Sequence, residues 1–453
     1  MGVTYMNIFL LLLEIVVVLA AIYLGVRTGG IGLGLWGVVG IAVLVFVFHL
    51  PPGSPPVDAV EIILAVIVAS AIMQAAGGID YLVAVAARII QKNPSGIVYI
   101  APLVAFIFTV GAGTGNIYYS LIPVIYQVAY QNKIRPERPL AVASVASQMG
   151  IVASPVSAAM AAMLTLVGPK GMSLPAILIL VFPASVIALL VASFVQSRLG
   201  KPLEEDEEYQ RRLAAGQIKP PNSDILNKNP SDLPSQARWS AWIFLAGVAL
   251  IMLLSIFPAL RPTFSGGVGG SAPLSTTVMI QLVMYTLATV LIVLAKVKPA
   301  DVLKQSILSS GITAIIALFG LAWLADTFIT ANNDAIVNAL GGLVKVAPWS
   351  FAIALFIVAA LTTSQSGATR ALVPIGIALG IPAQLLVGMW PSVIGIYLFP
   401  ANGSQLATVG IDETGTTRIS KYVLYHSFTI ATLIGWIVSV VIACLLTVLF
   451  FGV

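Results

Sequence analysis

This sequence of 453 residues has few of the residues on which soluble enzymes and metalloproteins depend. Charged residues make up 9% of the chain, whereas soluble proteins carry charge on about a quarter of their residues. Cys444 is the single cysteine, and His49 and His426 lie far apart in the expected topology. The sequence therefore offers no disulfide framework, no cysteine-based metal site and no histidine pair, and we expect neither a metal nor another cofactor.

Long apolar runs take the place of polar sequence. The hydrophobic fraction is 59% and the mean hydropathy is +1.03. Segments such as "NIFLLLLEIVVVLAAIYLGV" (7–26) and "FTIATLIGWIVSVVIACLLTVLFFGV" (428–453) are long enough to cross a bilayer, which takes about 20 apolar residues. We therefore expect an all-α polytopic membrane protein. Its net charge of +5 reflects membrane topology and does not indicate nucleic-acid binding.

One segment, 198–238, is polar and rich in proline. It carries equal numbers of basic and acidic residues, including the acidic run "EEDEE" at 204–208. We interpret it as a cytoplasmic linker with one short helix, which separates a first hydrophobic part (1–197) from a second (239–453). Docking of a regulatory partner on this linker is an open alternative to a plain connection.

The two hydrophobic parts resemble each other in the order of their motifs. The matched positions are Asp80 with Asp334, Pro94 with Pro348, Pro123 with Pro374, and Pro155 with Pro400. Weak internal symmetry of this kind is typical of secondary transporters. Because we expect an odd number of crossings in each part, the second repeat would be inverted relative to the first.

The apolar pattern predicts about ten transmembrane helices plus two re-entrant hairpins. The hairpins cover 97–131, interrupted at "GAGTGN", and 350–381, interrupted at "SQSG". Amphipathic interfacial stretches at 80–92 and 331–345 precede them. The spans after the hairpins, 139–167 and 384–411, are discontinuous at "ASPVS" (153–157) and "FPANGS" (399–404), because proline removes a backbone donor. The other spans lie near 6–26, 31–50, 59–77, 174–197, 240–258, 276–296, 306–328 and 423–451.

Basic residues orient this topology. With both termini periplasmic, most lysines and arginines fall on the cytoplasmic side, as the positive-inside rule expects. These are Arg27, Arg88, Lys92, Lys133, Arg135, Arg138, the linker cations, Lys296, Lys298, Lys304, Arg418 and Lys421. Outside lie Lys170, Arg261 and Lys345, and Arg370 belongs to neither side.

Arg370 follows the tip of the second hairpin, within the membrane. A central arginine costs about 2.5–3.5 kcal/mol even on lenient insertion scales, so it indicates a ligand or a partner. A salt bridge to Glu14, Glu61 or Asp326 is the structural alternative. A substrate is the alternative that we favour, because the planar guanidinium can hold a carboxylate through two hydrogen bonds.

The hairpin tips and broken helices should meet near the midplane, where helix N-termini present partial positive charge to an anion. For small and hydroxyl residues there, such as Ser154 and Ser157, close helix packing is the alternative. The predicted substrate-binding residues are Arg370, Thr114, Gly115, Asn116, Ser154, Ser157, Ser364, Gln365, Ser366, Thr369, Asn402, Gly403 and Ser404.

The segment "DETGTTRI" (412–419) follows the second broken helix on the cytoplasmic side. In this segment, the candidates for gating or coupling are Asp412, Glu413, Thr414 and Thr417. A further candidate is Glu14, an acid in the middle of the first span. For Asp412 and Glu413 the alternative is capping of the helix end. For Glu14 it is a hydrogen bond to a neighbouring helix or subunit.

Five motifs resemble those of the anaerobic four-carbon-dicarboxylate transporter (Dcu) family: "AGTGNIYYSLIPVI", "ASPVSAAM", "LAWLADTF", "SQSGATRALVPIGIALG" and "DETGTTRISKYV". The resemblance runs nearly end to end, although the proline-rich tail 219–234 departs from it. It implies antiport of fumarate, malate or aspartate for succinate across the inner membrane of bacteria in anaerobic metabolism. It also implies ten spans with both ends periplasmic.

Other classes of membrane protein are open alternatives. A proton- or sodium-coupled carboxylate symporter would share the same site, and an anion channel would need a continuous polar pore. An enzyme is not expected, because the sequence has no catalytic triad, metal cluster or nucleotide-binding loop. The expected partners are small dicarboxylates and the lipid bilayer, with a homodimer as a further expectation and no nucleic acid.

Overall fold

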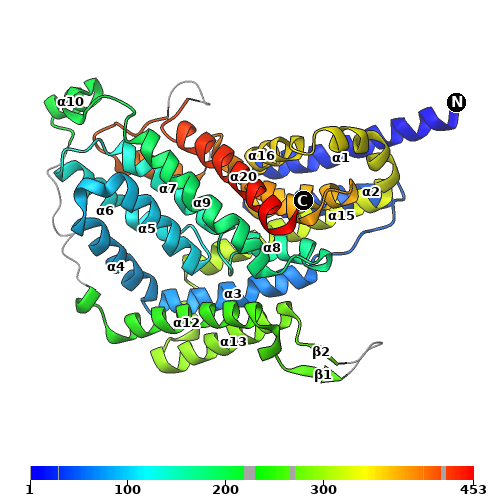
Figure 1. Ribbon diagram of the computed structural model, residues 1–453, viewed down its shortest axis with the longest axis horizontal. Coiled ribbons are helices and arrows are strands. Elements are labelled where there is room, and N and C mark those ends of the chain that lie inside the picture. The colour runs from blue at the N-terminus through cyan, green and yellow to red at the C-terminus, as the bar shows by residue number, and fades with distance from the viewer. Residues whose placement is uncertain (1, 29, 219–229, 266–270, 401, 420–424) are drawn as a thin grey trace.

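The computed structural model of this chain describes residues 2–28, 30–218, 230–265, 271–400, 402–419 and 425–453. Most of these residues form helices packed side by side, with α10 (Glu207–Ala214) at one end of the long axis and the N-terminus at the other (Figure 1). A small antiparallel hairpin of β1 (Thr263–Ser265) and β2 (Ser271–Pro273) projects away from the α10 end. The predicted all-α architecture is confirmed at this level.

The apolar runs form helices because a helix satisfies its backbone groups internally, as the bilayer requires. The first hydrophobic part contains α1 (Gly2–Thr28), α2 (Gly32–Phe46), α3 (Val57–Ala75), α4 (Gly78–Lys92), η1 (Pro94–Gly96), α5 (Ile97–Ala112), α6 (Ile117–Gln131), α7 (Glu137–Val152), α8 (Ala158–Val167), η2 (Gly168–Lys170) and α9 (Leu174–Gln196). The linker contains η3 (Leu203–Glu205), α10 and η4 (Pro230–Asp232).

The second hydrophobic part continues the same pattern. It contains α12 (Ser235–Ile256), η5 (Pro258–Leu260), α13 (Thr276–Ala295), α14 (Pro299–Val302), α15 (Ser306–Val346), α16 (Ser350–Thr362), α17 (Gln365–Ala378), α18 (Ala383–Met389), η6 (Trp390–Tyr397), α19 (Gly403–Ile411) and α20 (Thr429–Phe451).

The helix interruptions lie where the sequence predicts them. α5 ends at Gly113 (φ 72°) and α16 ends at Thr363 (φ 50°), both in the left-handed conformation. α6, which follows α5, has no side-chain cap, but three other helices after a break do: Ser157 caps α8, Ser364 caps α17 and Asn402 caps α19. Each cap oxygen accepts a backbone N–H of the first turn, which satisfies a donor that the helix itself leaves unpaired.

Some predicted boundaries are right and others are wrong. α15 consists of two helices joined across a kink at the non-helical Asn332 (φ −114°), so the predicted break between 306–328 and 331–345 is present. The span predicted at 384–411 opens with α18 and then tightens into η6, which has Pro391 at its start. α20 begins at Thr429 instead of 423. Residues 219–229 and 420–424, and the side chains of Asp334 and Lys345, lie outside the described residues.

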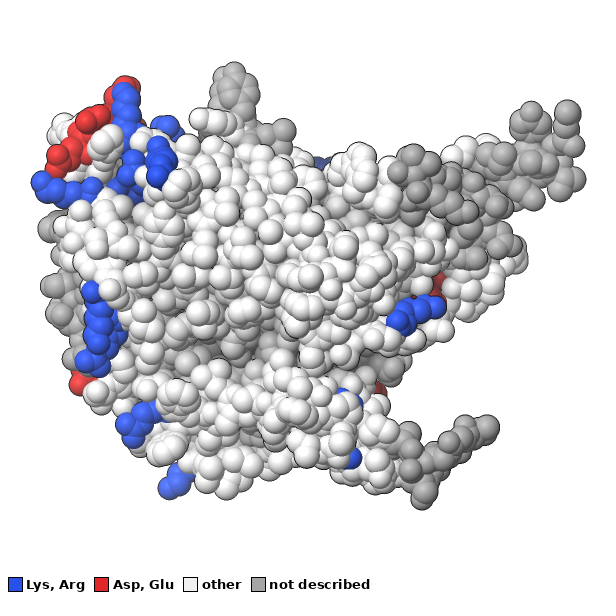
Figure 2. All heavy atoms as spheres, in the orientation of Figure 1, with Lys and Arg blue, Asp and Glu red and all other residues white. Residues whose placement is uncertain are grey.

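The predicted number of about ten transmembrane helices stays a prediction. By length and composition, 6 helices in the described ranges can cross a membrane without a break, and the pair α3 and α4, bent by 74°, could add a seventh. The remaining crossings of the predicted ten would have to be built from shorter apolar helices such as Ala158–Lys170 and Ala383–Tyr397. The chain is a multi-pass membrane protein. Figure 2 agrees, since charged residues gather at the α10 end and the middle of this face is nearly free of them.

Glycines allow α2 and α15 to pack closely. A Cβ atom added at Gly320 would lie 1.9 Å from the carbonyl oxygen of Gly34, and one added at Gly34 would lie 1.9 Å from the carbonyl oxygen of Ile316. Small residues let membrane helices approach in this way, and the gain is van der Waals contact along both backbones.

We expect Gly320→Ala to lower the thermal stability of the purified protein. Overpacking costs about 1–3 kcal/mol, which exceeds the gain of about 1 kcal/mol from better helix propensity. Gly410→Ala is the matched control, because nothing lies within 4 Å of a Cβ atom added there. If both variants melt at the wild-type temperature, the close approach of α2 and α15 is incorrect.

Candidate functional site

The hairpin tips and broken helices border one cavity of about 300 Å³, which we name the polar cavity. One wall consists of mostly apolar residues of α3, together with the hydroxyl of Ser70, and of the start of α15. The opposite wall carries predicted binding residues from both halves of the chain, namely Thr114, Gly115, Asn116, Ser157, Gln365, Ser366 and Asn402. The structure therefore brings together side chains that are distant in the sequence, as the repeat pattern predicts.

Helix N-termini converge on the polar cavity. Ala158 and Ala159, the first residues of α8, line it, as do Gln365 and Ser366 at the start of α17. The residues that precede α6 and α19 line it as well. Since each N-terminus carries partial positive charge and free N–H groups, this cavity can stabilise an anionic group without a cation in its wall.

Other predicted binding residues are used by the protein itself in this conformation. Those that do not line the polar cavity are Ser154, Ser364, Thr369, Gly403 and Ser404. Ser154 donates to the carbonyl of Val110 (2.7 Å), and Thr369 accepts from the indole of Trp390 (2.8 Å). Ser404 donates to the side chain that caps its own helix (2.7 Å). These bonds fix the helix ends that shape the cavity.

Arg370 faces a second cavity of about 260 Å³, which we name the arginine cavity. The loop before α3 (Ser54–Pro56), the C-terminal end of α8 and Asp326 of α15 complete its wall. Only 3% of the Arg370 surface is exposed, and its Nε and Nη2 atoms have no hydrogen-bond partner in the described part of the chain. A buried guanidinium in this state is strongly disfavoured unless something binds it.

The acids weighed as structural partners of Arg370 are occupied elsewhere. Glu14 accepts from the side-chain amide of Asn332 (2.6 Å), and Glu61 accepts from the side-chain amide of Gln281 (2.9 Å). Asp326 accepts from the Ser54 N–H (2.6 Å). Among the described residues, Arg370 forms no ion pair with any of them. The salt-bridge interpretation of Arg370 is therefore wrong, whereas the bond of Glu14 to a neighbouring helix is present.

The two cavities have helices of their lining in common. α3, α8, α15 and α17 line both of them, and Ser366 in the polar cavity is four residues from Arg370 in the arginine cavity, so both face the same side of α17. α3 and α15 run antiparallel. At one end the Ile307 N–H donates to the side chain of Gln74, and at the other end the Ser54 N–H donates to Asp326. The polar cavity lies toward the first end and the arginine cavity toward the second.

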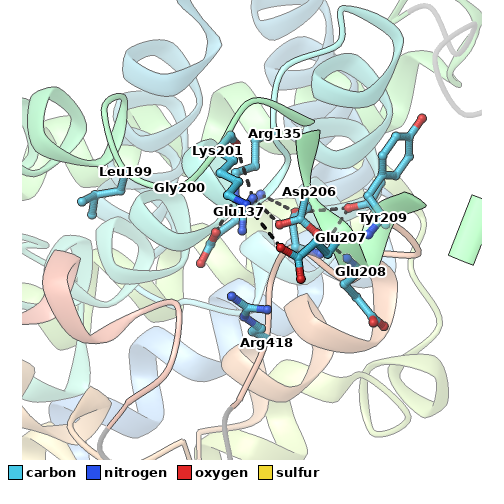
Figure 3. Close-up of polar contacts among 12 residues, drawn as sticks. Arg135, Glu137, Leu199, Gly200, Lys201, Asp206, Glu207, Glu208, Tyr209 and Arg418 are labelled. Carbon is cyan, nitrogen blue, oxygen red and sulfur yellow. Dashed lines mark hydrogen bonds and ion pairs between the residues drawn. The ribbon is translucent and has the colours of Figure 1, made fainter. Parts of the chain in front are cut away.

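The linker docks on the connection between α6 and α7 through a buried cation (Figure 3). Arg135, 3% exposed, donates to Glu137 (2.6 Å) and to Asp206 of the linker (2.6 Å). Asp206 also caps α10 by accepting from the Tyr209 N–H (3.0 Å). Burial alone would raise the pKa of Asp206, but the Tyr209 N–H and the Arg135 guanidinium outweigh it and hold that pKa below its ordinary value.

The "DETGTT" turn is organised by its own aspartate. Asp412, 1% exposed, accepts from the N–H groups of Thr414 (3.0 Å) and Thr417 (2.7 Å), and from the hydroxyls of Thr414 and Thr416. The neighbouring Glu413 offers its carbonyl oxygen to Arg212 of α10 (3.2 Å). In this conformation the turn is thus a folded unit tied to the linker.

The sequence reasoning missed residues that complete these cavities. Gln148 of α7 lines the polar cavity, and its carbonyl oxygen accepts from the Gln365 amide (3.0 Å). Thr165 and Ser54 line the arginine cavity. An amide inside an apolar span, as in "ASQMG", was the available signal for Gln148. Ser54 gave none, because it belongs to a connecting loop.

Paired helix breaks that border cavities inside the protein are typical of membrane transporters of the secondary type. The family model for the anaerobic C4-dicarboxylate membrane transporters matches residues 10–451, and the chain belongs to this family. The resemblance noted from the motifs is therefore confirmed. So is the expectation that the protein is not an enzyme, since its relatives are named as transporters.

Curated relatives match nearly the whole chain. DcuB of Escherichia coli O157:H7, an anaerobic C4-dicarboxylate transporter, is 37% identical over 438 residues, which cover 95% of this chain and 96% of the relative. The C4-dicarboxylate transporter DcuA of Wolinella succinogenes is 37% identical over 431 residues, covering 95% and 98%. Among solved structures, Neisseria gonorrhoeae MtrF, from a class of antimetabolite efflux pumps, matches with a TM-score of 0.56 and 14% identity over 90% of this chain and 84% of that one. That likeness concerns the fold alone.

Proposed function

We propose that this protein is an antiporter that exchanges four-carbon dicarboxylates, such as fumarate, malate or aspartate, for succinate across the bacterial inner membrane. Its relatives are named for C4-dicarboxylate transport, which supports the substrate class. The observation that carries the proposal is the buried guanidinium of Arg370 with two nitrogens unbonded in the described structure.

The free atoms of Arg370 suit a carboxylate. Nε and Nη2 lie on the same edge of the guanidinium, so their N–H groups can donate in parallel to the two oxygens of one carboxylate. Ser366 lies one turn away on α17, and a helical turn rises about 5.4 Å. A four-carbon diacid that is bound to Arg370 can therefore reach the hydroxyls and helix N-termini of the polar cavity with its second carboxylate.

Discontinuous helices around a shared site support transport by alternating access. In our proposal α8 and α17, with the hairpins, move relative to α3 and α15, and the site opens to one side at a time. An empty carrier would have to reorient with Arg370 unneutralised, which costs several kcal/mol. This penalty disfavours return without substrate and so favours exchange over net transport.

The helix contacts support a division into two inverted repeats, 1–197 and 239–453, joined by the linker 198–238. Contacts of the first half recur between the corresponding helices of the second. The matching pairs are α1–α2 with α12–α13, α2–α15 with α13–α3, α5–α7 with α16–η6, and α8–α17 with α19–α6. The symmetry also supports the counterpart roles of the two hairpins.

Flux in proteoliposomes distinguishes exchange from its rivals. We expect rapid uptake of labelled fumarate only when the vesicles contain succinate. Equal uptake into empty vesicles would reject exchange. Asp326, which lines the arginine cavity, favours a proton-coupled symporter as the second candidate, and that function would be indicated by uptake into empty vesicles driven by a pH gradient.

Cysteine labelling tests the proposed orientation. In a Cys444→Ser background, a cysteine at Thr263 should react from the periplasm, whereas one at Gln217 in the linker should react only after the membrane is permeabilised. Both positions are exposed. Periplasmic labelling of Gln217→Cys would invert the topology.

A further inference from the structure

A third cavity contains three cations and no described acid. It measures about 260 Å³ and lies between α4 and the start of α12, with Arg88, Lys92 and Arg238 in its wall. We name it the basic pocket. Tyr81, Ile89 and Ser231 also line it, and the described lining residues include no carboxylate. Because α3, α8, α15 and α17 contribute nothing to it, the basic pocket is separate from the transport path.

The fold brings these cations together without pairing them. Arg88 and Lys92 lie four residues apart on α4 and therefore share one face of that helix. Arg238 comes from the first turn of α12, which packs against α4. None of the three belongs to an ion pair among the described residues, although linker cations such as Arg212 do. Three like charges around one cavity repel one another, and a bound anion would relieve that repulsion.

The surroundings of the basic pocket are apolar and aromatic. Trp239 is 59% exposed and Trp242 is 54% exposed, both on α12 next to Arg238, and Ile89 at the pocket is 39% exposed. Tryptophan is enriched at the membrane–water interface, where its ring lies at the level of the lipid headgroups. α12 is itself long and apolar enough to cross a membrane, so its first turns lie at that interface.

We propose that the basic pocket binds the phosphate of an anionic phospholipid. Arg88, Lys92 and Arg238 donate to the phosphate oxygens, and the acyl chains lie along Ile89, Trp239 and Trp242. Basic pockets between membrane helices are suited to such headgroups. Free phosphate shares the chemistry of the headgroup but would leave the exposed tryptophans uncovered, so the apolar rim favours the lipid.

Native mass spectrometry of the full-length protein tests this site. Phosphatidylglycerol is titrated into protein in neutral detergent, with phosphatidylcholine as the uncharged comparison. We expect wild type to retain phosphatidylglycerol selectively. In the double variant Arg88→Gln/Arg238→Gln the affinity should fall about 25-fold, because each basic residue near an anionic lipid contributes about fivefold. Lys298→Gln is the matched control, since it removes an exposed charge outside the basic pocket and should change nothing.

Two results would overturn the proposal. One is equal retention of phosphatidylglycerol by wild type and the double variant. The other is thermal stabilisation of wild type by inorganic phosphate that equals the stabilisation by phosphatidylglycerol, which would assign the pocket to the free ion. If the double variant does not fold, two single variants test the site instead. We expect Lys92→Gln to retain phosphatidylglycerol more weakly than wild type, and Arg238→Lys, which keeps the charge, to retain it nearly as well.

Discussion

Replacing Arg370 with Gln is expected to abolish dicarboxylate exchange while the protein still folds. The variant loses the full positive charge that faces the arginine cavity. A dianion that leaves water without an opposite charge incurs a desolvation cost of several kcal/mol, and helix termini recover only about 0.3–2 kcal/mol each. Affinity should fall by far more than tenfold, since 1.4 kcal/mol is one decade. Fumarate–succinate exchange in proteoliposomes at matched protein levels measures the effect.

Two further variants separate charge from geometry. Arg370→Lys keeps the charge but loses the planar pair of donors, so exchange should fall and not vanish. Arg198→Gln removes an equal charge from an exposed position and should exchange normally. If Arg370→Gln exchanged dicarboxylates at the wild-type rate, the role of Arg370 would be structural and it would not bind the substrate.

The second large effect is expected at Arg135. Arg135→Gln leaves Glu137 and Asp206 without their shared cation, and breaking a buried ion pair from one side costs about 3–5 kcal/mol. The lower end applies, because Glu137 keeps the hydroxyl of Ser427 (2.6 Å). The thermal midpoint should fall, and the linker should become sensitive to limited proteolysis.

The control for Arg135 is a surface pair of the same linker. Lys133 and Glu204 are 2.8 Å apart, but their side chains are 78% and 64% exposed. Exposed pairs contribute little, so Lys133→Gln should leave both melting and proteolysis nearly unchanged. Equal effects of the two substitutions would show that burial of Arg135 does not anchor the linker.

Docking of the linker bears on transport because it reaches the turn that follows the second broken helix. Arg212 of α10 contacts Glu413, and the Glu137 N–H donates to Thr416 (3.2 Å). We expect that releasing the linker would loosen this turn. A slower exchange rate with an unchanged apparent substrate affinity in Arg135→Gln would be the kinetic sign.

Local sequence predicted the helix breaks well, because their causes are local. Gly113 adopts a positive φ, and Ser157, Ser364 and Asn402 cap new helices within three residues. Such signals need no tertiary information. The same holds for the unusual cost of an arginine inside an apolar span, which singled out Arg370 before its surroundings were known.

Tertiary contacts account for what the sequence did not predict. Asp206 pairs with Arg135 across 71 residues, and no pattern in "EEDEE" distinguishes it from its acidic neighbours. Likewise, the separation of Arg370 from the hairpin tips depends on how α8 and α17 pack against α3 and α15. The kink at Asn332 agrees with the boundary predicted between 306–328 and 331–345, but the sequence did not predict the bond from Asn332 to Glu14, which joins this point of α15 to α1.

Ligand-dependent thermal stability tests the central claim, that Arg370 binds the substrate, most directly. A ligand at 100 times its Kd stabilises the folded state by about 2.7 kcal/mol, and only binding to the folded protein has this effect. Succinate and fumarate should raise the melting temperature of wild type and of Arg198→Gln, but not that of Arg370→Gln. Equal stabilisation of Arg370→Gln and wild type by the same dicarboxylates would contradict the account.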